Sequence, residues 1–128
     1  MGTQYLLDSN IIIGFLDNRL PSKGMIFVSK VIDNMPNLSV ISKIEVLRYN
    51  TTEFAMKVLE DFIKYSNIRE LDAKTVSETI KLCRQSKIKL PDAIIAATCL
   101  VNKYVLLTRN VKDFAHIADL TIINPWEL

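Results

Sequence analysis

The sequence predicts a three-layer α/β/α domain with a central, mostly parallel sheet of four or five strands and helices on both faces. Short apolar runs alternate along the chain with segments of helical periodicity, which is typical of strand–helix units in a parallel sheet. These runs are continuously apolar, as expected of strands that are covered on both faces. The chain has 128 residues, of which 49% are hydrophobic, so we expect one domain, residues 1–128, with a substantial core.

The predicted strands are short segments bounded by polar or turn-forming residues. Apolar residues dominate them, and short apolar runs of this length are typical of buried strands. The expected strands are residues 4–8, 38–41, 68–71 and 104–108, with a fifth candidate at 120–123.

Two amphipathic segments between the strands predict helices at the surface. In residues 51–65, apolar side chains recur at helical spacing opposite a charged face. In the second helix Asp72 is the expected N-cap, and Val76, Ile80 and Cys83 mark the expected buried stripe.

A third segment, PDAIIAATCLV at residues 91–101, predicts a deeply packed helix because it is apolar nearly all round. Pro91 suits the start of a helix, where its missing N–H would have no partner. Cys83 and Cys99 lack metal-binding spacing, and with a single His in the chain they predict neither a zinc site nor a disulfide framework. We expect both to be reduced thiols in the core.

Charge and hydropathy set further expectations. The formal net charge of +2 is too small to argue for or against a nucleic-acid partner, so the distribution of charge must decide. The sequence shows neither a basic leader followed by a long apolar segment nor an apolar run of the roughly 20 residues that a membrane-spanning helix needs. We therefore expect a cytoplasmic protein with no membrane contact.

Four acidic residues stand where a predicted strand ends or a helix begins. Asp8 and Glu45 follow the first two strands, Asp92 opens the apolar helix, and Asp113 follows the fourth strand. Because the carboxyl ends of parallel strands open toward one edge of the sheet, these side chains can converge on one crevice. Clustered carboxylates raise one another's pKa unless a cation lies among them, and oxygen ligands suit Mg²⁺ or Mn²⁺. The sequence thus indicates a divalent metal site.

Each acid also has a local structural explanation, and these alternatives remain open. Asp8 can cap the first helix, and Asp92 lies in a first helical turn, where the helix dipole favours any carboxylate. Two acids stand at capping-box spacing, in which an N-cap side chain and an acid three positions later bond to each other's backbone N–H. These are the pairs Ser42–Glu45 and Asn110–Asp113.

Four motifs in this order, LLDSN, SKIEVLR, LPDAIIAAT and LLTRNVKDF, are similar to those of PIN-domain ribonucleases. Over nearly the whole chain the sequence resembles the VapC-type toxins of bacterial and archaeal toxin–antitoxin pairs, and the closing INPW is similar to the tail of some members. The resemblance implies a PIN-like domain that hydrolyses an RNA phosphodiester with Mg²⁺ or Mn²⁺ and leaves a 5′-phosphate and a 3′-hydroxyl.

The resemblance also implies roles for individual residues. Asp8, Glu45 and Asp92 would be the core catalytic and metal-binding acids. Ser9, which replaces the Thr common after the first acid, would orient Asp8 through its hydroxyl, and Thr108 would have a comparable supporting role.

The fourth acid is open. Some relatives carry an acid directly after the Thr-Arg pair, where this sequence has Asn110, and others use the position that matches Asp113. Asn110 can coordinate through its carbonyl oxygen or hold a metal-bound water, so the departure bears on a second metal more than on the first.

Basic residues flank the motifs and are candidates for binding RNA phosphates. A solvated surface role is an open alternative for each of them. His116 lies past the last motif, and we expect a partly buried structural residue rather than a general base. The basic candidates are Lys43, Arg48, Lys89, Arg109 and Lys112.

The resemblance implies three partners. These are an RNA substrate, with tRNA as one candidate, a cognate VapB-like antitoxin that lies in an apolar groove, and a second copy of the chain in a homodimer. Residues 24–32 and 51–65 are rich enough in apolar side chains to be shared with a partner. Packing within the monomer is the alternative.

Two other functions remain open. A receiver-like signalling domain also gathers acids and Mg²⁺ at the carboxyl edge of a parallel sheet. It requires a phosphorylatable Asp after a central strand, for which Asp72 is the candidate, and it leaves Glu45 and Asp92 without a role. A catalytically idle PIN fold that binds RNA or acts as a scaffold is favoured by Asn110 alone.

Overall fold

The computed structural model describes residues 2–128 and contains a five-stranded sheet in which every pair of neighbouring strands is parallel. Each predicted strand has a counterpart, including the fifth candidate, and each is shorter than expected. The strands are β1 (Tyr5–Leu7), β2 (Asn37–Ser39), β3 (Asn67–Arg69), β4 (Val105–Leu107) and β5 (Ile122–Ile123). Their order across the sheet is β3-β2-β1-β4-β5.

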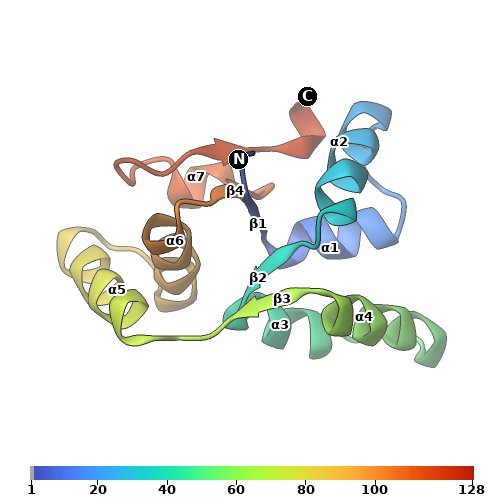
Figure 1. Ribbon diagram of the computed structural model, residues 1–128, viewed down its shortest axis with the longest axis horizontal. Coiled ribbons are helices and arrows are strands. Elements are labelled where there is room, and N and C mark those ends of the chain that lie inside the picture. The colour runs from blue at the N-terminus through green and yellow to red at the C-terminus, as the bar shows by residue number, and fades with distance from the viewer. Residues whose placement is uncertain (1) are drawn as a thin grey trace.

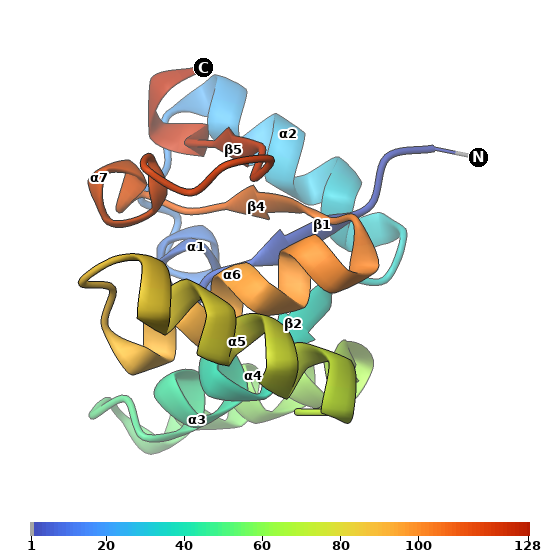
Figure 2. The same ribbon diagram turned by 90° about the vertical axis from the view of Figure 1, so that its left-hand side faces the viewer.

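Helices cover both faces of the sheet (Figure 1), which confirms the predicted three-layer α/β/α class. The first face carries α1 (Ser9–Leu16), α2 (Ser22–Asp33), α3 (Val40–Leu47) and α4 (Glu53–Tyr65). The second carries α5 (Ala73–Gln85), α6 (Leu90–Asn102) and α7 (Val111–Phe114), and α5 lies outside α6 (Figure 2). A 3₁₀ helix, η1 (Pro125–Glu127), packs beside α2. Within residues 2–128, no helix combines the length and apolar character needed to cross a membrane.

The two central strands explain why the apolar runs of the sequence are continuous. Successive side chains of a strand point to opposite faces. Leu7 and Leu107 accordingly join the core under α1–α4, whereas Leu6 and Leu106 join the core under α5–α7. All four are fully buried, and burial of a Leu side chain contributes about 1.5–3 kcal/mol.

The buried face of α5 differs from the prediction. Asp72 is the N-cap as expected, since one of its carboxylate oxygens accepts a hydrogen bond from the Thr75 N–H at 2.9 Å. However, Val76, Ile80 and Cys83 point outward, and Ile80 is 50% exposed. The prediction of a core thiol is therefore wrong for Cys83.

Threonines take the place of that stripe. Thr75, Thr79 and Leu82 are buried against α6, and Leu82 is only 6% exposed. The Thr79 hydroxyl donates to the Thr75 carbonyl at 2.7 Å, so the buried hydroxyl has a partner within the helix. A satisfied threonine can be buried at little cost, and this is why α5 is rotated by about one residue from the expected orientation. Cys99, on α6, is a buried thiol as predicted.

This rotation predicts opposite sensitivities for two neighbouring apolar residues of α5. Leu82→Ala should lower the free energy of unfolding by about 2–4 kcal/mol, because it leaves a cavity against α6. Ile80→Ala should change it by about 0.5 kcal/mol or less. Urea unfolding followed by circular dichroism measures both, and a larger loss for Ile80→Ala would show that the predicted stripe, not the observed one, is buried.

Candidate functional site

Asp8 lies where the sheet reverses its strand order. From β1 the chain builds outward through β2 to β3, and then returns to place β4 on the other side of β1. Leu7 pairs with Leu107, and the Asp8 N–H donates to the Leu107 carbonyl at 3.0 Å. Asp8 and Thr108 are therefore neighbours at the carboxyl ends of β1 and β4, and this reversal point is where ligands bind in open parallel sheets.

The Asp8 carboxylate is buried, with 5% of the residue exposed, and both of its oxygens are hydrogen-bonded. One accepts from the Ser9 N–H at 2.9 Å. The other accepts from the Thr108 hydroxyl at 2.8 Å and from the Asn10 side-chain amide at 3.3 Å. Asp8 is also the N-cap of α1, so the capping alternative and its place in the candidate site hold together.

Burial raises the pKa of Asp8 to about 6 from a usual value of 3.8. The hydrogen bonds from Thr108 and Ser9 oppose this shift because they stabilise the ionised carboxylate, and the negative charges of Glu45 and Asp92 add to it. Among residues 2–128 the ionised form of Asp8 has no cationic partner, and it is close enough to Glu45 and Asp92 for their charges to act on it.

Glu45 joins the site through Ser9 rather than through its own backbone. The Ser9 hydroxyl donates to the Glu45 carboxylate at 3.1 Å. Ser9 was expected to orient Asp8 by that hydroxyl, and this prediction is wrong, since its backbone N–H is the group that reaches Asp8.

The capping box of Ser42 and Glu45 is not formed. Strand β2 ends at Ser39, and Ser39 is the N-cap of α3, accepting from the Ile41 N–H at 3.0 Å. The helix therefore begins three residues earlier than the box requires, and Glu45 lies beyond its first turn. In the described part of the chain, residues 2–128, the buried Ser42 hydroxyl has no hydrogen-bond partner.

Asp92 lies in the first turn of α6, where the sequence placed it, and is half-buried. Burial is the main cause that raises the pKa of Asp92, and the negative charges of Asp113 and Glu45 raise it further. The positive charge of Lys89 lowers it. Asp92 thus feels the field of acids from both sides of the site.

Asp113 and Asn110 are exposed at α7. The Asn110 N–H donates to the Thr108 hydroxyl oxygen at 3.1 Å, so that hydroxyl connects Asp8 to the start of α7. The second predicted capping box is wrong as well: within residues 2–128 the Asn110 side chain makes no capping hydrogen bond.

The four predicted acids therefore share one rim of the sheet. Asp8 is coupled electrostatically to Glu45 and Asp92, and Asp92 to Glu45 and Asp113. As they are placed in residues 2–128, no three Asp, Glu, His or Cys side chains are gathered closely enough to hold a single ion. The donor chemistry nevertheless fits a hard divalent cation, because every donor is a carboxylate, amide or hydroxyl oxygen.

The predicted basic residues differ in exposure. Lys43 is half-buried, and Arg48, Lys89, Arg109 and Lys112 are exposed. The sequence analysis missed Asn10, whose side chain donates to Asp8 at 3.3 Å and accepts from the Arg109 N–H at 3.1 Å. Its position directly after Asp8 and Ser9 in LLDSN was the available signal.

His116 lies apart from the hydrogen bonds that hold Asp8 and Glu45. It is exposed, contrary to the expectation of partial burial, and its Nε2 lies 3.2 Å from the Ser86 hydroxyl at the end of α5. The imidazole is thus bonded to the outer helix layer and has no part in the acidic rim.

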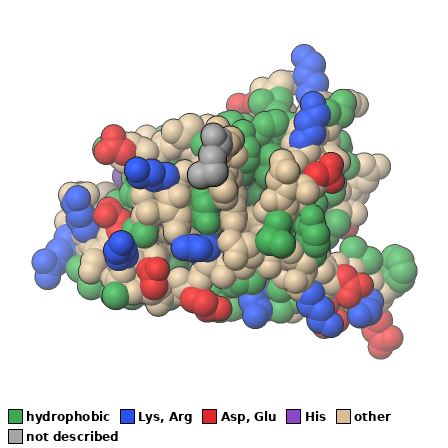
Figure 3. Space-filling view, in the orientation of Figure 1, with side chains coloured by type: hydrophobic (Ala, Val, Ile, Leu, Met, Phe, Trp, Pro, Cys, Tyr) green, Lys and Arg blue, Asp and Glu red, His purple; other side chains and the backbone are tan. Residues whose placement is uncertain are grey.

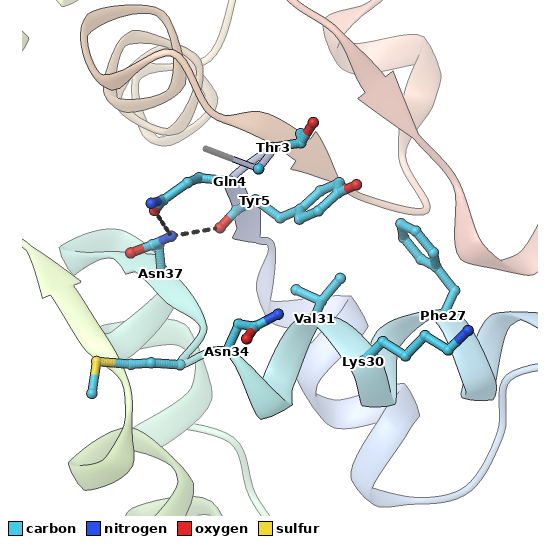
Figure 4. A pocket seen from close by; sticks show the side chains of 10 residues that line it. Thr3, Gln4, Tyr5, Phe27, Lys30, Val31, Asn34 and Asn37 are labelled. Atoms are coloured by element: carbon cyan, nitrogen blue, oxygen red, sulfur yellow. Dashed lines mark hydrogen bonds between the residues drawn. The ribbon is translucent and has the colours of Figure 1, made fainter.

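A cavity of about 520 Å³ lies at the opposite, amino-terminal edge of the sheet (Figure 4). Tyr5, Phe27, Lys30 and Asn37 line it together with other residues, all of them outside the predicted site. The Asn37 amide donates to the Tyr5 carbonyl at 3.0 Å, so the polar floor of the cavity is already engaged in joining β1 and β2.

Comparison with known proteins gives a consistent family assignment. Residues 5–120 match the family model of the PIN domain. Among solved structures, a chain of VapBC-1 from nontypeable Haemophilus influenzae is 27% identical, with a TM-score of 0.80, covering 98% of this chain and 100% of that chain. A chain of a toxin–antitoxin complex from Klebsiella pneumoniae is 26% identical, with a TM-score of 0.75 and the same coverage of both chains.

DNA-bound VapBC from Salmonella typhimurium also contains a similar chain, at 20% identity and a TM-score of 0.78, covering 97% of this chain and 99% of that chain. At this identity the likeness supports the fold alone. No curated protein sequence matches this chain significantly.

The raised pKa of Asp8 predicts a pH-dependent stability difference. The folded protein binds a proton at Asp8 between about pH 4 and 6 more readily than the unfolded chain does, so the cost of the buried charge is fully present above pH 6. In EDTA, Asp8→Asn should therefore be more stable than the wild type at pH 8, by up to about 3 kcal/mol at about 1.4 kcal/mol per pH unit, and the gap should close toward pH 4.

Urea unfolding across this pH range measures the difference. Asp33→Asn, which replaces an exposed acid at the end of α2, is the matched control and should show little dependence on pH. A wild type that is more stable than Asp8→Asn at pH 8 would contradict the burial penalty.

Proposed function

The chain belongs to the PIN domain family, and on this basis we propose that it is a VapC-type toxin, an endoribonuclease that hydrolyses an RNA phosphodiester with Mg²⁺ or Mn²⁺. The likeness to chains of VapBC-1 and of a toxin–antitoxin complex supports the toxin assignment. The observation that carries the nuclease proposal is Asp8, a buried acid at the reversal point of the sheet that feels the charges of Glu45 and Asp92.

In this proposal Asp8, Glu45 and Asp92 hold the ion, and Asp113 or Asn110 completes the set. When bound, the ion lowers the pKa of an attacking water and neutralises the charge that develops on the phosphate. The chain's own contribution is orientation. Three donors hold Asp8: the Thr108 hydroxyl, the Ser9 backbone N–H and the Asn10 side-chain amide. The Ser9 hydroxyl holds Glu45.

Binding of RNA at this rim requires positive charge near the acids. Lys89 already lowers the pKa of Asp92 through its charge, so it lies within electrostatic reach of the rim. We assign Lys43, Arg48, Lys89, Arg109 and Lys112 to the phosphates of the substrate. Affinity for RNA should then fall as salt rises, because phosphate contacts release counterions.

A VapB-like antitoxin is the proposed protein partner. An apolar hollow of about 160 Å³ lies between α1 and α4, and Leu16, Tyr49 and Val58 are part of its lining. Phe54, on its edge, is 81% exposed, which is unusual for a large aromatic side chain. An apolar antitoxin segment would cover it.

We also propose that the protein forms a homodimer and is located in the cytoplasm, where the RNA substrate is found.

The receiver-like alternative is disfavoured by the sheet order. A phosphorylatable Asp would have to follow a central strand, but Asp72 follows β3 at the edge. Asp72 is engaged as the N-cap of α5, and hydrogen bonds from Thr75 lower its pKa. A catalytically idle PIN module remains the alternative, and a measured cleavage activity would exclude it.

The decisive prediction concerns metal-dependent cleavage. Purified protein incubated with a tRNA pool and Mn²⁺ should give discrete fragments that disappear with EDTA. Asp8→Asn and Asp92→Asn should each lower the cleavage rate at least about 100-fold, because they remove ligands rather than the outer partners whose loss costs 10–100-fold.

Asp61→Asn is the control, since Asp61 is exposed on α4 and pairs with Lys57. It should cleave as the wild type does. Identical fragments from wild type and both site variants would point to a contaminating nuclease, and binding of tRNA without any cleavage would favour the idle module.

A further prediction separates the two candidates for the fourth ligand. If Asp113 serves, Asp113→Asn should weaken activation by Mn²⁺ roughly 10-fold or more, whereas Asn110→Ala should change it little. Titration of cleavage rate against Mn²⁺ measures both variants. The reverse ranking would assign the ligand to Asn110.

A further inference from the structure

The end of the chain docks into a socket that two glycines create. Trp126, in η1, lies against α1, where a methyl group on Gly14 would come within 2.6 Å of the indole ring. A methyl group on Gly24, in α2, would overlap the Pro125 carbonyl oxygen. The Asn124 side chain caps η1 by accepting from the Trp126 N–H at 2.9 Å. The indole therefore packs against α1, and the residues before it, Asn124 and Pro125, hold its backbone in place.

Trp126 in turn holds Arg109. The guanidinium carbon of Arg109 lies 4.6 Å from the centroid of the indole ring, well inside the range of a cation–π contact. Among residues 2–128 the ion pairs are Arg19–Asp17 and Lys57–Asp61, so Arg109 has no carboxylate partner there. A guanidinium stacked on a ring keeps its edge N–H groups available, and these are the groups that bind phosphate in a bidentate manner.

The backbone of Arg109 is tied to the acidic rim. Its N–H donates to the Asn10 side chain at 3.1 Å, and Asn10 donates to Asp8 at 3.3 Å. The preceding residue, Thr108, donates directly to Asp8. Arg109 is thus held at its backbone by the network around Asp8 and at its guanidinium by Trp126.

We propose that Trp126 is a positioning residue that holds the Arg109 guanidinium beside the acidic rim to receive a phosphate of the RNA. An unrestrained Arg loses side-chain freedom when it binds a phosphate, and this loss weakens binding. In this structure the stacking has already ordered the side chain before RNA arrives. That the ligand is RNA rests on the proposed ribonuclease function. The placement of the guanidinium rests on the packing of Trp126 against α1 and on its contact with Arg109.

A double-mutant cycle tests whether Trp126 acts through Arg109. The probe is a short, fluorescein-labelled single-stranded RNA, bound in EDTA so that binding is measured apart from cleavage. Arg109→Ala should weaken binding about 10-fold or more, as expected for loss of a charged hydrogen-bond donor. Trp126→Leu should weaken it roughly 2- to 5-fold, which corresponds to loss of an exposed cation–π contact.

The combined variant should bind no more weakly than Arg109→Ala alone, because the ring has no role once the guanidinium is gone. Trp126→Phe retains an aromatic face and should restore much of the affinity. Arg19→Ala, at an exposed arginine that pairs with Asp17, should bind as the wild type does. In Mn²⁺, Trp126→Leu should raise KM with little change in kcat.

Additive losses in the cycle, or equal losses for Trp126→Leu and Trp126→Phe, would overturn the proposal, because the ring would then serve packing alone. Trp126 is the single tryptophan of the chain, so a change in its emission with Arg109→Ala reports the contact directly, and an unchanged emission would count against it. The coupled loss of binding without any cleavage would uphold the positioning role and reject the ribonuclease.

Discussion

The rest of the structure depends on how one carboxylate is kept inside the protein. Asp8 is buried where β1 meets β4, and the neighbours that satisfy it are three neutral donors from two segments: the Ser9 backbone and the Asn10 amide at the start of α1, and the Thr108 hydroxyl after β4. The bond between Thr108 and Asp8 joins residues 100 positions apart in sequence. It can form only if β4 returns to lie beside β1, so the topology of the sheet and the state of the carboxylate depend on each other. The same hydroxyl connects the start of α7 to Asp8, because it also accepts a hydrogen bond from the Asn110 N–H.

The sequence was sufficient to predict the five strands and the helices α4, α5 and α6, but it did not predict α2 or α7. Continuous apolar runs such as Leu6–Leu7 and Leu106–Leu107 have one simple explanation, a strand covered on both faces. Helix α6 could be recognised because it is apolar nearly all round. An acid after such a strand is conspicuous for the same reason. The meeting of Asp8 with Thr108 was not derivable from these patterns alone, because strand order is set by long-range packing.

The errors share a physical cause, which is that short polar side chains can satisfy themselves locally. Thr79 bonds to a carbonyl of its own helix, and this allows α5 to bury threonine and expose Ile80. Ser39 caps α3, so the helix begins earlier than expected, and Ser42 cannot form the expected capping box with Glu45. Periodicity and spacing identify which residues could fill a role, but a hydroxyl with two competing partners is assigned only by the packed structure.

The proposed activity places opposite electrostatic demands on the same rim. A divalent cation is favoured by acids that repel one another. Burial is the main cause of the raised pKa values of Asp8 and Asp92, and the charges of neighbouring acids add to both shifts. RNA is a polyanion, which the same acids repel. Neutral donors hold Asp8, so its carboxylate is oriented without its charge being cancelled. The positive charge of Lys89 acts on Asp92. Among residues 2–128 Arg109 contacts an uncharged ring rather than an acid. Its positive charge is therefore available to RNA, and it does not neutralise the acids that would hold the cation.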